Sequence, residues 1–433
     1  MYLSTKKSYL KLVIFLALFL LAHYFIVKNM ILLSKDLLYG DYSGEKTTPA
    51  PLYGLFRIPN TELFERSKAN DRLAGDFAQV YFPSKEFNKL NKNYRYGQFD
   101  PWNRSSRYAP FIHYLCAISY CKLDYGPASL VHIYLQLVLF YIAIAFVLFV
   151  LNTLKYLPLS LFLVNAGLFL TPVGLSWLER GQFSLYVAIS YMFLILGILK
   201  KHTLFFLLSA LFAFIKLTSF PAIFVILSVY ILSSGSIKEL KSRVFLTILF
   251  FMVIVLLLAV LPTDGYYFLR GLYQQENFIP PQGVSLGKLL PIEYVKLTPF
   301  VLIGFGLLYV RKFQNKLDGY LPFYVCVCIM MCLYPTVAYE YNLLTMFCFI
   351  PFFMYWVSPS VSLDSFITRK IMKLVYLLFL AIASCLRIFL HPLNVDAIVI
   401  SVYLFAAVFF LIGPFALPWF VSRLQKNAYV GVQ

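Results

Sequence analysis

Long runs of apolar residues, separated by short polar links, occupy most of the sequence. A membrane-spanning helix needs about 20 consecutive apolar residues, and fewer where protein buries its ends. By this criterion the sequence predicts spans at residues 8–31, 127–152, 156–172, 182–199, 244–262, 294–310, 320–337, 341–357, 371–390 and 397–420.

The apolar run from Thr203 to Leu232 is too long for one span. It contains the segment KLTSFP, in which Lys216 and Pro221 predict a turn between two short helices. These two helices bring the count to about twelve spans. The predicted fold class is therefore an all-α polytopic membrane protein, with residues 1–433 forming one integral membrane domain.

Composition and charge support this interpretation and indicate an orientation. Of the 433 residues, 61% are hydrophobic and only 13% are charged, whereas soluble domains carry about 25% charged residues. The net charge of +18 argues for orientation in a membrane rather than for nucleic-acid binding. With a cytoplasmic N-terminus, the basic residues of the inner links are Lys6, Lys7, Lys155, Lys200, Lys201, Lys238, Lys241, Arg243, Arg311, Lys312, Lys316, Arg369, Lys370, Lys373, Arg423 and Lys426.

The N-terminal apolar run is too long for a signal peptide, and no small-residue cleavage site follows it. We interpret it as a retained first span. The expected protein crosses the membrane many times, has both termini in the cytoplasm and belongs to the bacterial inner membrane.

Two segments are too long to be simple connectors. Residues 32–108 and 263–293 are predicted to form large outer loops on the same membrane face. Long loops in compact proteins are usually functional, so we expect a site at the outer surface. The segment YAPFIHYLCAISYCK, before the second span, has the mixed aromatic and apolar character of an interfacial amphipathic helix.

The seven cysteines do not predict a disulfide framework or a zinc site. Five of them lie in apolar spans. Cys116 and Cys121 lie near one membrane face, but a helical spacing of five residues points their side chains apart, so the sequence favours free thiols there. We expect no metal and no cofactor.

Asp76, in the segment GDFAQVYFPSKEF, is the first candidate for chemistry. A carboxylate at the outer surface could take a proton from an attacking hydroxyl. Its position before the segment FAQVYFPSKEF also predicts a simple helix cap. The two roles are compatible, and the sequence leaves both open.

Cationic and polar side chains near the predicted outer face form a second set. Arg180 and Gln182 flank Gly181 at the mouth of a span, and Arg180 could hold a phosphate with two hydrogen bonds. The alternative is an interfacial arginine paired with Glu179. Lys216 is equally compatible with a phosphate contact and with a snorkelling end residue. Weaker candidates for substrate binding are Arg270 and Glu340.

No motif for a cytosolic nucleotide, a metalloprotease or a nucleophilic serine is present. The chain resembles the membrane α-mannosyltransferases that use polyprenyl-phosphate mannose, within the GT-C superfamily of glycosyltransferases. The resemblance covers about residues 70–345. It is carried by GDFAQVYFPSKEF, by RYAPFIHYL, by the Gly-Gln and Lys-Pro pairs between Gly181 and Pro221, and by YPTVAYEYNLL, in which Tyr339, Glu340 and Tyr341 replace the usual Trp and His.

The resemblance implies transfer of a sugar, expected to be mannose, from a polyprenyl phosphate to a cell-envelope glycan or glycolipid at the outer face. It implies that Asp76 is the base and that Tyr81, Arg180, Gln182 and Lys216 contact substrate. The sequence leaves two alternatives open, a transporter or flippase and a polymerase or ligase of lipid-linked glycans. The scarcity of charge within the spans favours the transferase over the transporter.

Overall fold

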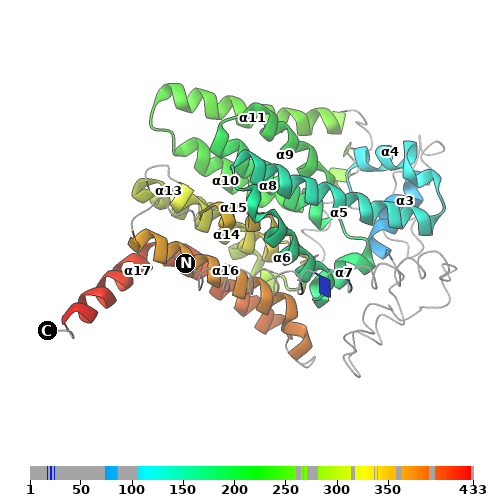
Figure 1. Ribbon diagram of the computed structural model, residues 1–433. Helices are drawn as coiled ribbons and strands as arrows, with labels where there is room; N and C mark the ends of the chain where they lie inside the picture. The colour runs from blue at the N-terminus through cyan, green and yellow to red at the C-terminus, as the bar shows by residue number, and fades with distance from the viewer. Residues whose placement is uncertain are drawn as a thin grey trace.

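The computed structural model describes residues 17, 20, 21, 24, 74–85, 106, 108–259, 265–266, 268–270, 281–313, 317–335, 337–338, 340–356, 363–389 and 395–430. These residues are mainly helical (Figure 1). The α-helices are α3 (Gly75–Lys85), α4 (Pro110–Ile118), α5 (Tyr125–Val150), α6 (Leu157–Phe169), α7 (Pro172–Arg180), α8 (Ser184–Lys200), α9 (Thr203–Ile215), α10 (Phe220–Leu232), α11 (Ile237–Ala259), α13 (Ile292–Phe313), α14 (Leu317–Leu333), α15 (Ile350–Trp356), α16 (Leu363–Phe389) and α17 (Val395–Val430).

Short 3-10 helices and one strand pair complete the described structure. The 3-10 helices are η3 (Tyr120–Lys122), η4 (Leu154–Tyr156), η5 (Leu217–Ser219), η6 (Leu286–Lys288) and η7 (Glu340–Phe349). Strands β1 (Gln282–Gly283) and β2 (Val337–Ala338) are parallel. They join the second predicted outer loop to the short link before η7.

Every predicted span from residue 127 onward coincides with a helical segment. The predicted first span, 8–31, lies almost wholly outside the described residues. Among the described residues, the helices long and apolar enough to cross a membrane are four, namely Tyr125–Val150, Ile237–Leu258, Ile292–Phe313 and Asp396–Val421. The count rises to as many as six spans if each of two bent helix pairs is one span. The expected count of about twelve is not reached by this criterion, because segments such as Ser184–Lys200 and Tyr320–Leu333 are shorter than 18 residues.

Apolar surface that faces outward indicates a membrane environment. In α5 and α11 only 44% and 28% of the most apolar window is buried inside the protein. Side chains such as Ile142 and Phe149 remain 58% and 67% exposed. Water would solvate this surface poorly, whereas lipid would cover it. These helices therefore suggest an integral membrane protein.

The predicted turn at Lys216 is confirmed. Helices α9 and α10 meet at an angle of 119° across Lys216 and η5. Lys216 adopts an extended backbone conformation, and Pro221 stands in the first turn of α10, where a missing N–H costs nothing. A second break, of 79° between α6 and α7, was not predicted. The short helix α7 follows this break and ends with Arg180.

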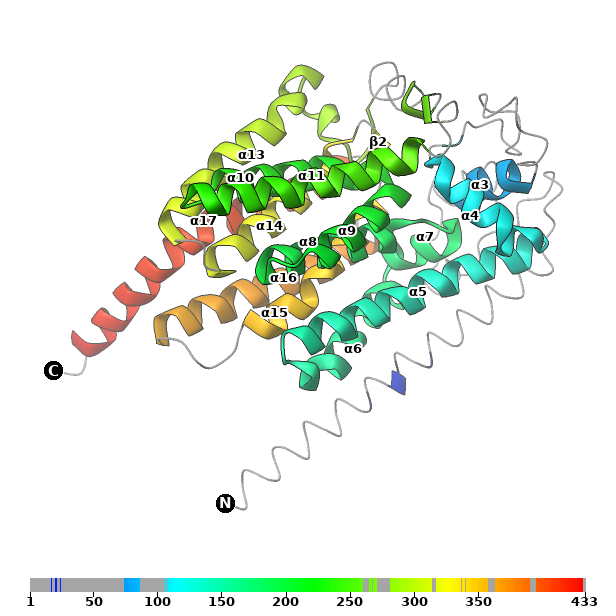
Figure 2. The same cartoon turned by 90° about the horizontal axis from the view of Figure 1, so that it is seen from above.

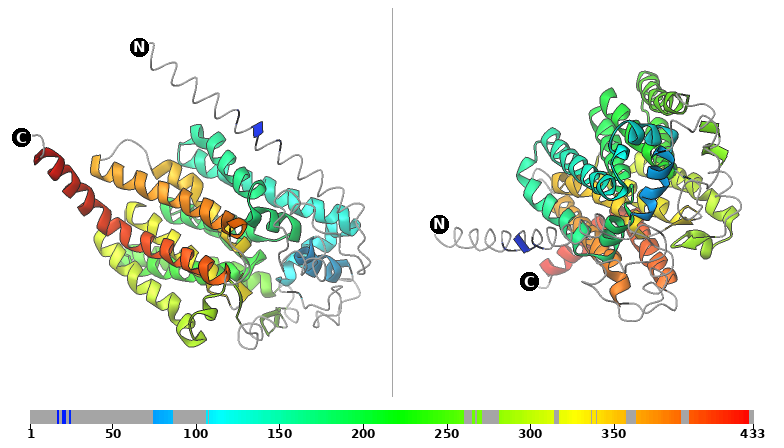
Figure 3. Two further views of the ribbon diagram at one scale, coloured as in Figure 1. Left: turned by 90° about the horizontal axis from the view of Figure 1, so that it is seen from below. Right: turned by 90° about the vertical axis from the view of Figure 1, so that its right-hand side faces the viewer.

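The helices pack into a bundle with one hydrophobic core, which includes residues from Ala74, just before α3, to Phe410 on α17. The single-domain interpretation stays a prediction. Helices α3 and α4 lie together at one end of the bundle (Figures 2 and 3). Helix α8 starts near this end and runs 17 residues away from it, a length of about 25 Å. The basic turn at Lys200 and Lys201 is therefore far from α3.

Candidate functional site

An ion pair connects two segments that are far apart in the sequence. Nε of Arg180 lies 2.9 Å from Oδ2 of Asp76, although 104 residues separate them. The Asp76 side chain is 8% exposed and that of Arg180 is 28% exposed. The carboxylate is thus inside the protein, and the arginine is the more accessible member. Arg180 therefore pairs with Asp76, whereas the Glu179 side chain, the partner that the sequence offered, lies outside the described structure.

Asp76 occupies the first turn of α3, one residue after the helix begins at Gly75. A carboxylate there interacts favourably with the positive end of the helix dipole. Gln79, one turn further along, donates from Nε2 to Oδ1 of Asp76 at 3.4 Å. Arg180 and Gln79 therefore hold the two carboxylate oxygens from different sides, and the orientation of Asp76 is fixed.

The backbone around Gly181 places Arg180 beside α3. Thr171 caps the start of α7 by accepting a hydrogen bond from the Gly174 amide, and Pro172 follows as the first helical residue. The helix ends at Gly181, whose φ of 62° is left-handed. Such a C-terminal residue is usually glycine, because other residues are strained there. The chain then turns through Gln182 into α8.

Lys216 reaches the same region from the break between α9 and α10. Its Nζ lies 3.1 Å from Oε1 of Gln182 and 3.4 Å from Oγ of Ser184. It is close enough to Asp76 and Arg180 for both of their charges to act on it. Its ammonium group therefore points to the start of α8, where these two polar side chains hold it. Asp76, Arg180, Gln182 and Lys216 thus converge at one end of the bundle.

His132 on α5 links the two sides of the ion pair. Its ring stacks on Phe77, with centroids 4.6 Å apart, and contacts Phe183 at 4.3 Å. Its Nε2 lies 3.2 Å from the carbonyl oxygen of Gly181. The same Nε2 lies 2.8 Å from the side-chain amide nitrogen of Gln136, and Nδ1 lies 3.3 Å from the Tyr120 hydroxyl. The ring therefore contacts Phe77, which follows Asp76, and Gly181, which follows Arg180.

A second buried histidine fastens α3 to α4. Nδ1 of His113 donates to the carbonyl oxygen of Val80 at 3.2 Å, and Nε2 lies 2.8 Å from Oγ of Ser106. Burial lowers the pKa of His113 to about 4, although hydrogen bonds to the backbone oppose that shift. His113 is therefore a neutral ring at physiological pH, and it holds the helix that carries Asp76.

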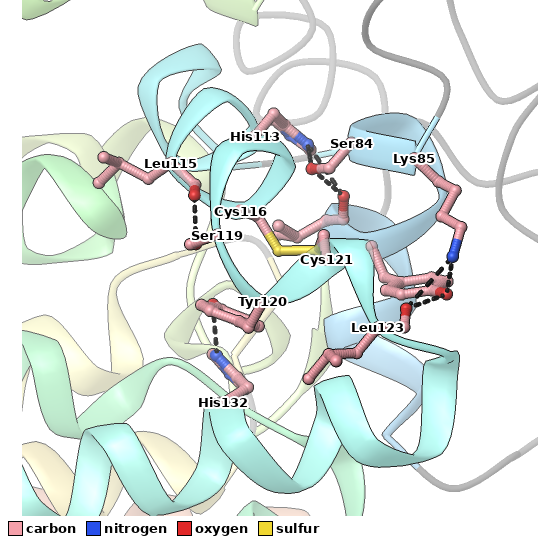
Figure 4. Close-up of a disulfide and its surroundings, with 12 residues drawn as sticks. Ser84, Lys85, His113, Leu115, Cys116, Ser119, Tyr120, Cys121, Leu123 and His132 are labelled. Atoms are coloured by element: carbon pink, nitrogen blue, oxygen red, sulfur yellow. Dashed lines mark hydrogen bonds between the residues drawn. A yellow bond between two sulfur atoms is a disulfide. The ribbon is translucent and has the colours of Figure 1, made fainter.

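The structure corrects the expectation of free thiols at Cys116 and Cys121, which form a disulfide (Figure 4). The expectation was wrong because α4 ends at Ile118 and Ser119 leaves the helical conformation, so the helical spacing does not extend to Cys121. The bond closes a short loop that presents Tyr120 to His132. The predicted interfacial helix is correspondingly shorter, and it consists of α4 and η3.

Tyr81, expected to contact substrate, is engaged elsewhere. It is 4% exposed, and its hydroxyl donates to the carbonyl oxygen of Leu123 at 2.9 Å and accepts from Nζ of Lys85 at 3.1 Å. These contacts fix α3 to the segment before α5 (Figure 4). They lie on a different side of α3 from Asp76, five residues earlier.

Two further candidates are not brought to the ion pair by the described contacts. Arg270 is exposed on the short described segment 268–270. Glu340 begins η7, and its side chain is outside the described structure. Ala338, two residues before Glu340, accepts a hydrogen bond from the amide of Val284 at 2.8 Å. The two predicted outer links therefore meet, which was not predicted.

Gln79, His132 and Ser184 were missed as members of this site. His132 stands inside an apolar span, where a lone polar residue is itself a signal of function. Gln79 is three residues after Asp76, and this spacing places both side chains on one helix face. Ser184 gave no signal, because serine is common at helix starts.

Within the part of the chain that the structure describes, no group of three or more His, Cys, Asp or Glu side chains is placed to hold a metal ion. The chain matches no protein-family model and no curated protein sequence. The site must therefore be interpreted from its own geometry and from the resemblance described above.

Proposed function

We propose that this protein is an integral membrane glycosyltransferase that moves a sugar, expected to be mannose, from a polyprenyl phosphate to a cell-envelope glycan or glycolipid. The observation that carries the proposal is the 2.9 Å contact between Asp76 and Arg180 beside Lys216. It combines a carboxylate with two cations at one end of an apolar bundle. Transfer from a glycosyl phosphate requires that combination. The base serves the hydroxyl that attacks the anomeric carbon, and the cations bind the phosphate that is bonded to the same carbon.

The reaction would proceed by displacement at the anomeric carbon. The acceptor hydroxyl oxygen forms a bond to that carbon, and the bond from the carbon to the phosphate oxygen breaks. Asp76 takes the hydroxyl proton, and the phosphate leaves with the bonding electrons. Arg180 and Lys216 stabilise the negative charge that develops on the leaving group. No metal is required in this scheme, because the two side chains supply the positive charge.

The ion pair suggests how donor binding prepares the base. Without donor, the guanidinium group of Arg180 contacts Oδ2 of Asp76. An anionic phosphate beside Arg180 competes for the guanidinium group. The carboxylate then gives up part of this contact and can accept a hydrogen bond from the acceptor hydroxyl when the donor is in place. The buried position of Asp76, at 8% exposed, strengthens the competition because little water screens the charges.

The disulfide supports an outer location for this site. Disulfides persist in oxidising compartments and are rare in the cytoplasm. Cys116 and Cys121 lie on α4 and η3, which pack beside α3. The ion pair between Lys201 and Glu239 lies at the C-terminal end of α8, away from α3. This agrees with a basic cytoplasmic face and an outer face that carries Asp76. The proposed topology has about twelve spans, with both termini in the cytoplasm of a bacterial inner membrane.

A donor-dependence assay tests the proposal. The purified protein in lipid vesicles would receive radiolabelled polyprenyl-phosphate mannose or GDP-mannose, together with an envelope glycolipid extract. We expect label transfer from the lipid-linked sugar and none from the nucleotide sugar. Transfer from the nucleotide sugar alone would contradict the proposed donor. Movement of intact lipid-linked sugar across the vesicle membrane without transfer would instead indicate a flippase.

A further inference from the structure

Gln79 carries a buried hydrogen-bond acceptor that no described residue satisfies. The residue is 7% exposed, and its carbonyl oxygen Oε1 makes no hydrogen bond to any described residue. Its other amide atom, Nε2, donates to Oδ1 of Asp76. A buried polar atom without a partner costs about 1–3 kcal/mol. A ligand group that donates to Oε1 would therefore gain affinity.

The orientation of the Gln79 amide is determined by Asp76. Reversing the amide would turn Oε1 toward the carboxylate and place two acceptors against each other. The NH₂ group must face Asp76, so the carbonyl oxygen presents an acceptor beside it. The carboxylate of Asp76 and the carbonyl of Gln79 then form a pair of acceptors one helical turn apart on α3.

The chemistry of the site is divided between its two sides. Helix α3 contributes acceptors from Asp76 and Gln79, whereas the facing segments contribute the cations Arg180 and Lys216. A phosphate group accepts hydrogen bonds and carries negative charge, so it suits the cationic side. A sugar hydroxyl donates a hydrogen bond, so it suits the α3 side. Both groups belong to one molecule in a glycosyl phosphate.

We infer that Gln79 binds a hydroxyl group of the donor sugar, which places the sugar ring against α3 and the phosphate against Arg180 and Lys216. The inference rests on the proposed function and extends it from the phosphate to the sugar. It makes Gln79 a residue that distinguishes the lipid-linked sugar from the bare lipid phosphate. Because Gln79 is next to Asp76, the same contact orients the anomeric carbon toward the base.

Binding measurements on Gln79→Met test this inference. Methionine keeps the length and volume of glutamine but cannot accept the hydroxyl hydrogen bond. The probes are a short-chain prenyl-phosphate mannose, the same prenyl phosphate without sugar, and the four mono-deoxy forms of the mannose donor. The matched control is Thr247→Val on α11, which also removes a buried polar group without a hydrogen-bond partner.

We expect Gln79→Met to lower the affinity for the mannose donor about fivefold to tenfold. The affinity for the sugarless prenyl phosphate should not change. One mono-deoxy donor should bind the wild type and Gln79→Met equally, because the interacting hydroxyl is already gone. Thr247→Val should change neither affinity. If Gln79→Met bound both probes equally more weakly, or bound both as tightly as the wild type, the role of Gln79 would be overturned and the proposed function would stand. A wild type that binds neither probe would overturn the proposed donor itself.

Discussion

Gly181 and Phe77 are in such close contact that a Cβ atom at position 181 would lie 3.0 Å from the Cβ of Phe77. The same atom would lie 3.2 Å from the Cβ of Ala74. The first turn of α3 therefore rests directly on the link between α7 and α8. This contact is what brings Asp76 within reach of Arg180, because each stands next to one of the two contacting residues.

Gly181→Ala should damage both the fold and the site. The added methyl group meets α3, and alanine is strained at a φ of 62°. We expect a loss of about 1–3 kcal/mol in the free energy of unfolding and a lower transfer rate, because α3 must shift. Thermal unfolding in detergent and the transfer assay measure the two effects. Gly304→Ala is the control, since no atom of the described residues lies within 4 Å of a Cβ there. An equal effect of both substitutions would contradict the account.

His132 should act as a positioning residue. His132→Phe keeps an aromatic ring against Phe77 but loses the hydrogen bond to Gly181. We expect a reduction in kcat of about tenfold to a hundredfold, because a small displacement of reacting groups is costly. His132→Gln retains an N–H donor and should recover part of the rate. The readout is kcat at matched thermal stability. The account would be wrong if His132→Gln lost as much kcat as His132→Phe.

Lys216 should contribute to phosphate binding. Lys216→Met removes the charge but keeps much of the apolar stem. We expect the affinity for a short-chain prenyl phosphate to fall about tenfold to a hundredfold, because hydrogen bonds to charged groups are the stronger ones. Lys201→Met is the matched control, since Lys201 pairs with Glu239 at the other end of α8. Similar losses from both lysines would point to non-specific attraction by net positive charge.

His113 should make stability depend on pH in a defined window. Its pKa is about 4 in the folded protein and about 6.5 in an unfolded chain. Above pH 6.5 the ring is neutral in both states and costs nothing. Between pH 6.5 and pH 4 the unfolded state binds the proton first, so stability falls as pH falls. The full loss is about 3 kcal/mol and is reached near pH 4.

Unfolding of wild type and His113→Asn across that pH range measures this effect. The variant should show a shallower decline, because the residue that gains the proton is gone. Thr247→Val removes a buried side chain that does not titrate, and this control should keep the wild-type slope. A parallel pH dependence in wild type and His113→Asn would show that His113 does not titrate as described.

The sequence predicted the parts of the structure that follow from hydrophobic periodicity and from proline. The helical segments after residue 127 and the break at Lys216 were of this kind, because each depends on local residues. The number of spans was harder to predict from the sequence. A short helix such as α8 is buried by its neighbours, so it does not have the length of a lipid-exposed span. The disulfide was missed for a similar reason, because the helix end at Ser119 could not be read from spacing.

The site was predicted as a set of residue types but not as a set of contacts. Asp76, Arg180, Gln182 and Lys216 were chosen for their chemistry near one membrane face. Their pairing depends on the bundle, which brings α3 against a link 104 residues away. His132 was missed because its partner is the backbone carbonyl of Gly181. Every residue has such a carbonyl, so the sequence does not predict which one is contacted.

The central claim is that Asp76 is the base of a transfer reaction from a lipid phosphate, and a comparison of Asp76→Asn with the wild type tests it most directly. Asparagine keeps the shape of the side chain but cannot take a proton. The measurement is the single-turnover rate of mannose transfer from polyprenyl-phosphate mannose, with bound donor quantified separately.

We expect the transfer rate of Asp76→Asn to fall by at least about 100-fold while the variant still binds donor. Binding should persist because Lys216 and Arg180 remain. A transfer rate within a few-fold of wild type would contradict the account and leave Asp76 as a structural partner of Arg180.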